Sequence, residues 1–165
     1  MENNALNGLH REMLDRLFVA EFNTEYHHLL YRRYELKERL LRLSLALSAV
    51  VVFVCIKVFP AGCWPTVSGA ITLISTTVVP ILRWNRLMPR IEAAALRWAG
   101  LRNEYRNLWQ DSKMSGDWDD ALIELKKLRK KDGTVEKADG LLPKHDDLLK
   151  KAREQVIAMH RKVKQ

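Results

Sequence analysis

Apolar side chains gather in one run near the middle of the chain, the forty residues of Leu43–Leu82, which contain a single charged side chain, Lys57. A helix needs about 20 apolar residues to cross a bilayer, so the run is long enough for two crossings. Within it, Phe59–Pro65 holds two prolines and a glycine, residues that favour a sharp reversal. The pattern predicts a transmembrane helical hairpin at residues 40–84.

The alternative is a pair of core helices buried inside a protein without membrane spans. Both arms of the hairpin are apolar on all sides, a pattern typical of helices surrounded by lipid or by a large core. A chain of 165 residues has little other apolar material with which to cover them. Trp64 and Trp84 bracket the second arm, as amphipathic rings do at membrane interfaces. The membrane interpretation is therefore preferred.

Charge predicts the orientation of this hairpin. The chain carries a formal net charge of +8, and much of the excess flanks the apolar run. Basic residues near membrane segments stay on the cytoplasmic side, so both termini are expected in the cytoplasm of a bacterial inner-membrane protein. The flanking residues are Arg32, Arg33, Lys37, Arg39 and Arg42 before the run and Arg83, Arg86, Arg90 and Arg97 after it.

The polar segments on either side of the run have helical periodicity. Residues 1–39 are predicted as one or more N-terminal helices, with one face formed by Met13, Leu17, Ala20, Thr24, His27, Tyr31 and Tyr34. Residues 85–113 continue a 3-4 spacing that is typical of a coiled coil. This predicted seam pairs the two extensions within one chain or joins subunits, and its members are Trp84, Leu87, Ile91, Ala94, Trp98, Leu101, Tyr105 and Leu108.

The remaining residues, 114–165, form a basic tail that is also predicted to be helical. Asp117 can cap a short amphipathic helix, Asp132-Gly133 reads as a turn, and the stretch to Pro143 reads as an exposed loop. A last helix is expected from about Lys144. The predicted fold is therefore all-α: a transmembrane helical hairpin whose long cytoplasmic helical extensions form a small bundle.

Catalytic motifs are missing from the sequence. It has no glycine-rich phosphate loop, no Cys/His metal spacing and no nucleophile elbow. His27 and His28 are adjacent, so on a helix they point about 100° apart and make a poor metal pair. We expect no enzymatic activity, no cofactor and no metal.

Two sets of side chains are candidates for function. Small hydroxyl residues share a face of the second arm, where they either pack helices together or line a water path in a homo-oligomer; they are Ser68, Thr72, Ser75 and Thr76. A basic cluster in the tail is either a solvated face, a contact to lipid headgroups, or a contact to nucleic acid or a nucleoprotein. Its members are Lys126, Lys127, Arg129, Lys130 and Lys131.

The layout resembles the small two-transmembrane effectors of bacterial antiphage systems, including the SLATT-type proteins. The likeness lies in Tyr31-Arg32-Arg33-Tyr34 leading into Leu43–Phe59, and in Trp64–Trp84 leading into Leu87–Leu108. It implies an oligomeric effector that perturbs or permeabilises the inner membrane when a partner sensor releases it. The resemblance further implies that this sensor is a cyclic-nucleotide system or a retron reverse transcriptase with its nucleic acid.

A second hypothesis is a non-enzymatic membrane anchor or scaffold whose cytoplasmic bundle recruits a soluble partner. Under either hypothesis the expected partners are the lipid bilayer, further copies of the chain, and a regulatory protein or nucleoprotein complex.

Overall fold

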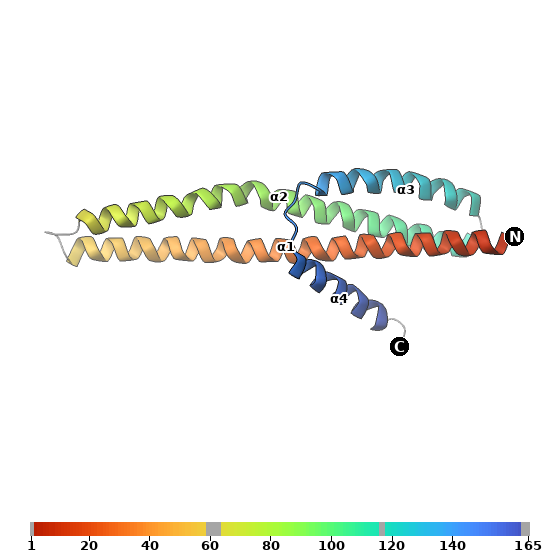
Figure 1. The fold of residues 1–165 in the computed structure, drawn as a ribbon, viewed down its shortest axis with the longest axis horizontal. Helices are drawn as coiled ribbons and strands as arrows, with labels where there is room; N and C mark the ends of the chain where they lie inside the picture. Colours follow the sequence, from red (N-terminus) through yellow and green to blue (C-terminus); the bar gives the residue numbers. More distant parts are fainter. Residues whose placement is uncertain (1, 59–63, 116–117, 163–165) are drawn as a thin grey trace. The chain divides into compact units, whose positions relative to one another are not determined.

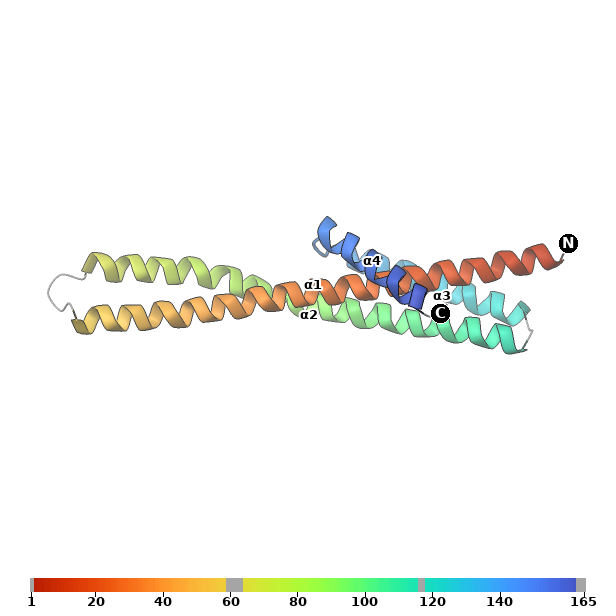
Figure 2. The same ribbon diagram turned by 90° about the horizontal axis from the view of Figure 1, so that it is seen from below.

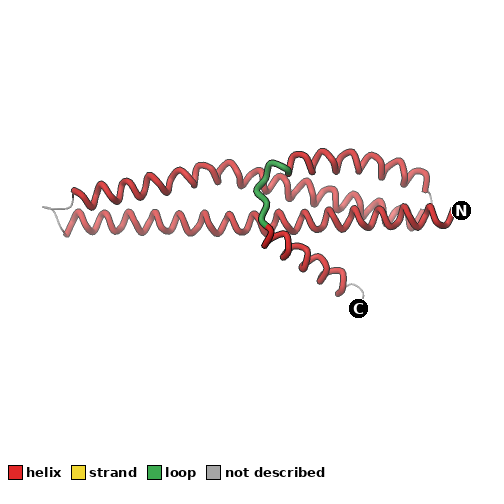
Figure 3. The backbone as a smooth tube through the Cα atoms, viewed as in Figure 1, coloured by secondary structure: helices red, strands yellow, loops and turns green. Residues whose placement is uncertain are grey.

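The computed structural model describes residues 2–58, 64–115 and 118–162 of the protein. These ranges form four helices, α1 (Glu2–Val58), α2 (Trp64–Ser115), α3 (Trp118–Asp139) and α4 (Asp146–Lys162) (Figure 1). Within the described ranges there is no strand, and the loop that joins α3 to α4 is the main non-helical segment (Figure 3). The all-α part of the predicted fold is therefore correct.

The chain divides into two compact units, and α1 and α2 each contribute to both. Unit 1 consists of Met1–Leu30 and Arg90–Gln165, and unit 2 of Tyr31–Pro89. Unit 1 therefore holds the first part of α1, the last part of α2, and all of α3 and α4. Unit 2 holds the remainder of the two long helices.

The core of unit 1 is a cluster of buried side chains from three helices. In both views the first part of α1 runs beside the last part of α2, and α3 lies along them (Figures 1 and 2). Burying one Leu, Met or Phe side chain contributes about 1.5–3 kcal/mol, so this cluster is the main source of stability in unit 1. Its buried members are Met13, Leu17, Ala20, Trp98, Leu101, Tyr105, Ala121, Leu125 and Val135.

The face predicted for the N-terminal helix is largely the buried face of α1. Met13, Leu17, Ala20, Thr24 and His27 are all buried in unit 1. The two polar members satisfy their hydrogen bonds inside the helix, since Thr24 Oγ1 donates to the Ala20 carbonyl at 2.7 Å and His27 Nδ1 bonds the Asn23 carbonyl at 2.6 Å. A spacing of three and four residues was enough to identify this face.

Helix α3 is longer than the sequence predicts. It runs through the expected turn at Asp132-Gly133 and ends only at Asp139, so most of the expected loop to Pro143 is helical. Asp132 is buried and holds the helix in place through its bond to Arg16, which offsets the low helix propensity of the glycine that follows. The helix then closes with the Gly140 amide donating to the Glu136 carbonyl at 3.0 Å.

Unit 2 has local ion pairs and exposed apolar side chains. Arg39 bonds Glu35 at 2.6 Å and Arg42 bonds Glu38 at 2.5 Å, each pair one turn apart on α1. The large apolar side chains that follow on α1 are solvent-exposed by 48–66% between Leu43 and Val54. Tyr34 is buried at the start of the unit, and the Lys37 ammonium lies 5.4 Å from the centre of its ring.

The predicted transmembrane hairpin at residues 40–84 is corrected by the structure. Among the described residues, no helix has a segment that is both long enough and apolar enough to cross a membrane. The prediction assigned one crossing to each arm of Leu43–Leu82, and each crossing needs about 20 apolar residues within one helix. The structure places this run at the ends of two much longer helices whose other parts are rich in charge. The predicted location in a bacterial inner membrane depended on the hairpin and is corrected with it.

Candidate functional site

Unit 1 contains a pocket of about 290 Å³ between its helices. It opens where α1, α2 and α3 meet the loop that leads into α4. Part of its wall is apolar and part is charged. The lining residues are Arg16, Val19, Asn23, Tyr26, His27, Trp98, Asp132, Glu136, Asp139, Gly140, Leu142, Pro143, Lys144 and Leu149.

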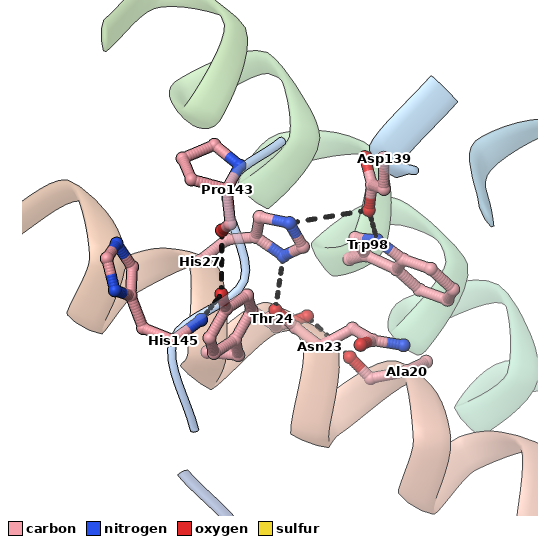
Figure 4. A network of polar contacts seen from close by, with 9 residues as sticks. Ala20, Asn23, Thr24, His27, Trp98, Asp139, Pro143 and His145 are labelled. Carbon is pink, nitrogen blue, oxygen red and sulfur yellow. Dashed lines mark hydrogen bonds and ion pairs between the residues drawn. The ribbon is translucent and has the colours of Figure 1, made fainter. Parts of the chain in front are cut away.

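A hydrogen-bond network around Asp139 forms one wall of this pocket (Figure 4). Asp139 is the last residue of α3, and its carboxylate accepts a short hydrogen bond from the Trp98 indole N–H of α2. The same oxygen lies 3.4 Å from His27 Nε2 of α1. This carboxylate therefore bonds α3 to α2 and lies beside α1, at the point where the chain leaves α3.

The position of His27 determines which of its nitrogens carries a proton. The Asn23 carbonyl can only accept, so His27 Nδ1, at 2.6 Å, is the donor. Burial lowers the pKa of His27, while the Asn23 hydrogen bond and the Asp139 carboxylate act in the opposite direction and His28 adds to the lowering. The ring therefore favours the neutral form with the proton on Nδ1.

Asp132 forms a second connection between helices, seven residues before Asp139 on α3. Its Oδ2 accepts from the Arg16 guanidinium of α1 at 3.1 Å and from the Tyr105 hydroxyl of α2 at 3.4 Å. Asp132 is buried, so these contacts replace the water it gives up. Burial raises the pKa of Tyr105, and the charge and hydrogen bond of Asp132 raise it further, so the phenol stays protonated as a donor.

Tyr26 fixes the loop between α3 and α4 to α1. Its hydroxyl donates to the Pro143 carbonyl at 3.0 Å and accepts from the His145 amide at 3.2 Å (Figure 4). At the other end of α4, His160 Nε2 lies 2.6 Å from Glu21 on α1. The loop that borders the pocket is therefore anchored at its side by a buried tyrosine.

These polar groups hold helices together, which leaves the apolar part of the wall as the surface available to a ligand. Val19, Leu142, Pro143 and Leu149 contribute it. Leu141, beside them in the loop, is 84% exposed. Arg16, Glu136 and Lys144 supply charge around this apolar surface. An apolar centre with a charged border is the arrangement typical of protein-binding sites.

The structure describes the side chains of only some of the predicted hydroxyl-face and seam residues, and those it describes are buried or half-buried. The side chains of Ser68, Thr72, Ser75, Thr76 and Trp84 lie outside the part of the structure that is described, although their backbone belongs to α2. Of the other predicted seam members, Leu87 and Leu108 are half-buried. The remaining five are buried in unit 1: Ile91, Ala94, Trp98, Leu101 and Tyr105.

The predicted basic cluster lies on the exposed surface of α3 and is partly neutralised. Lys127 pairs with Glu124 at 2.6 Å, Arg129 pairs with Glu12 at 3.1 Å, and Lys131 pairs with Glu104. Among the described residues, only Lys126 and Lys130 of this cluster have no ion-pair partner. The cluster therefore offers less free positive charge than its sequence indicates.

Sequence reasoning missed the residues that build the pocket wall. Asp132, Glu136 and Asp139 are spaced by four and three residues, which places them on one face of a helix, but the Asp132-Gly133 pair was interpreted as a turn. The partners of Asp132 and Asp139 are far away in the chain, so no local pattern could connect them; they are Arg16, Tyr105 and Trp98. In the described residues, no group of three or more His, Cys, Asp or Glu side chains is placed to hold a metal ion.

Comparison of the chain with models of protein families, with curated proteins and with solved structures finds no match.

Proposed function

We propose that this protein is a non-enzymatic helical scaffold whose unit 1 recruits a soluble protein partner through the pocket. The observation that carries the proposal is the apolar surface of the pocket wall, formed by Val19, Leu142, Pro143 and Leu149 and bordered by charge. Apolar surface left open to water on a rigid support favours association with a partner that covers it.

The pocket is large enough to receive a side chain of a protein partner. Its volume of about 290 Å³ is at the lower end of the range of ligand pockets, about 300–1,000 Å³. A large apolar or aromatic side chain inserted into a pocket contributes much of the affinity of a protein complex. The expected partner therefore inserts one apolar anchor residue.

The charges at the border favour a partner of mixed charge. Lys144 is basic and Glu136 is acidic, so an approaching surface meets both signs, while Arg16 is paired with Asp132. Charge at the rim of an interface increases the association rate and selects partners more than it adds affinity. Binding is therefore expected to weaken only moderately with salt.

The internal bonding of the site supports binding over catalysis. Asp132 accepts from Arg16 and Tyr105, and Asp139 accepts from Trp98. A general acid or base has to reach a substrate proton, and these carboxylates instead hold three helices together. The pairing of Lys127, Arg129 and Lys131 with carboxylates likewise supports a protein partner over direct contact with nucleic acid.

The test compares two matched valine or isoleucine substitutions in affinity capture. Val19→Asp places a carboxylate in the pocket, whereas Ile123→Asp makes a comparable change on α3 outside it; Val19 is 40% and Ile123 52% exposed. Proteins bound by the tagged full chain are quantified by mass spectrometry for both variants. The partner is expected to be retained by Ile123→Asp and lost by Val19→Asp.

The purified partner is then titrated against the same proteins by calorimetry. Val19→Asp should weaken binding at least about tenfold, because burying an unpaired carboxylate costs more than 1.4 kcal/mol. A second pair, Lys144→Glu at the border and Lys151→Glu on exposed α4, tests the contribution of charge. The proposal fails if every captured protein is retained equally by Val19→Asp and Ile123→Asp.

A second candidate is an effector of the antiphage type that has no membrane-spanning hairpin. The observation that favours it is the exposed apolar surface of α1 in unit 2, which a regulated assembly of several copies would cover. In this form, the partner bound to unit 1 controls whether copies assemble. The test is expression with the neighbouring genes under phage challenge: cell arrest is expected with the intact chain and absent with Leu47→Glu.

A further inference from the structure

The exposed apolar side chains of α1 follow a heptad repeat. Starting from the first, the spacing between them is four, three, four, three and four residues, which is the spacing of alternating d and a positions in a coiled coil. All six are between 48% and 66% exposed in the folded chain. They are Leu36, Leu40, Leu43, Leu47, Val50 and Val54, here called the α1 apolar face.

The flanking positions of this repeat are apolar as well. Val51 falls at an e position and Phe53 at a g position, and they are 60% and 63% exposed. All large apolar side chains that the structure describes as exposed between Leu36 and Val54 therefore lie at a, d, e or g. These are the four positions that contact a second helix in a coiled coil. A surface with this pattern fits a helix of the same kind.

We propose that the α1 apolar face binds the same face of a second copy of the chain, in an antiparallel coiled coil. This proposal does not depend on the pocket of unit 1.

The repeat is self-complementary when the second copy runs in the opposite direction. Leu36 of one copy then faces Val54 of the other, Leu40 faces Val50, and Leu43 faces Leu47. Each of these layers pairs a d position with an a position, which is the layer composition of an antiparallel two-helix coiled coil. The pairing continues symmetrically from one end of the face to the other, as a two-fold symmetric interface requires.

Charge at the edges of the face also favours the antiparallel direction. Lys37 and Arg39 occupy the e and g positions at one end, and Val51 and Phe53 occupy them at the other. In a parallel pair the basic side chains of the two copies would gather at the same end and repel each other. In an antiparallel pair e positions face e positions and g positions face g, so Lys37 lies across from Val51 and Arg39 across from Phe53. The basic side chains then lie on apolar ones, and Arg39 gains a cation–π contact.

The area of the face is sufficient for a stable dimer. A buried Leu or Val side chain removes roughly 60–100 Å² of apolar surface from water, so six from each copy supply about 700–1,200 Å². The e and g side chains add to this total. Specific interfaces begin at about 1,000–1,200 Å² of total buried surface, so the face reaches the size that a homodimer needs.

The first test is the mass of the purified full chain in solution, measured by sedimentation velocity across a range of concentrations. The expected mass is twice the 19.2 kDa of one chain. The variant Leu43→Glu/Leu47→Glu places two carboxylates in the central layers and should weaken the dimer by about 100-fold or more. The matched control is Leu14→Glu/Leu96→Glu, which changes two exposed leucines of unit 1 and should leave the dimer intact.

The second test measures direction without disturbing the central layers. In a chain with Cys55→Ser and Cys63→Ser, Leu36→Cys and Val54→Cys are made separately, and the two proteins are oxidised alone and as a mixture. The antiparallel arrangement predicts disulfide-linked dimers in the mixture and few in either protein alone. Efficient cross-linking of Leu36→Cys with itself would overturn the proposed direction.

The remaining outcomes identify other occupants of the face. A chain that stays monomeric and binds phosphatidylglycerol vesicles through Leu43 and Leu47 would show that lipid covers the face, and the proposal would be wrong. A dimer that persists in Leu43→Glu/Leu47→Glu, with helical content unchanged by circular dichroism, would place the interface elsewhere. A monomer that binds neither vesicles nor a second copy would also overturn the proposal.

Discussion

The two units of this protein use the same long helices in opposite ways. In unit 1 the apolar side chains of α1 and α2 are buried against each other and against α3, and the charged groups near them bond between helices. In unit 2 the large apolar side chains described between Leu36 and Val54 of α1 are exposed, and the ion pairs described on α1 join neighbours one turn apart on the same helix. The apolar side chains of unit 1 are covered by its own helices, whereas those described on α1 in unit 2 are exposed.

A pair of helices needs a further element to cover all of its apolar side chains. Two helices side by side can cover only one stripe of each other, and a third element must cover the next stripe. Unit 1 has α3 and α4 for this purpose, whereas unit 2 consists of α1 and α2 alone. An apolar face on the far side of such a pair stays open until another molecule binds it.

The largest expected difference between the two units is in the free energy of unfolding when one leucine is shortened in each. Leu101→Ala removes a fully buried side chain of unit 1 and should lower the free energy of unfolding by about 2–5 kcal/mol. Leu47→Ala removes a side chain that is 66% exposed and should change the stability of the monomer by less than about 0.5 kcal/mol. Urea unfolding of dilute monomer measures both. Equal losses would mean that unit 2 is as tightly packed as unit 1.

A smaller loss of stability is expected when the buried carboxylate of Asp132, which joins helices in unit 1, is removed. Asp132→Ala leaves the Arg16 guanidinium and the Tyr105 hydroxyl without their acceptor and should cost about 1–3 kcal/mol in urea unfolding. Tyr105→Phe removes only the longer of the two bonds and serves as the milder control. If Asp132→Ala unfolds with the stability of the wild type, the carboxylate does not hold α3 to the other helices.

A smaller change in folding stability is expected when pH falls and His27 takes up a proton. Burial lowers the pKa of this residue in the folded chain, and the groups that face it are Asp139 on α3, Trp98 on α2, and Tyr26 and His28 on α1. As pH falls below about 6.5, the unfolded chain takes up the proton first, so folding stability is full above that pH and declines below it.

The check is urea unfolding at pH 7.5, 6.5 and 5.5 for the wild type and for His27→Gln. The variant should lose part of the decline, because glutamine does not titrate and can still donate to the Asn23 carbonyl. His160→Gln, which changes an exposed histidine beside Glu21, is the matched control. An identical decline in His27→Gln and the wild type would assign the pH dependence to other groups.

The smallest effect lies in the ion pairs of unit 2. Arg39→Ala removes the exposed pair with Glu35, and such pairs one turn apart contribute about 0.3–0.5 kcal/mol. Unfolding measured at low and at high salt should show a difference only at low salt, because the pair is screened. A loss comparable to that of Asp132→Ala would mean that unit 2 depends on its charges as unit 1 does.

The sequence by itself predicted helices, and it identified the buried face of α1 in unit 1. Met13, Leu17, Ala20 and His27 could be placed on one face because helical spacing repeats every three to four residues whatever the partner is. The same reasoning failed for the hairpin, because apolar composition tells only that a segment avoids water. It does not tell whether a helix, a second chain or a bilayer covers it.

Tertiary structure decided the site and the true extent of α3. Asp132-Gly133 is a turn by local preference, but the contact of Asp132 with Arg16, 116 positions away in the chain, keeps it helical. The Asp139 contacts to His27 and Trp98 likewise exist only once three helices have met. Local spacing determines which residues share a face, whereas bonds between distant residues depend on packing, which no local pattern contains.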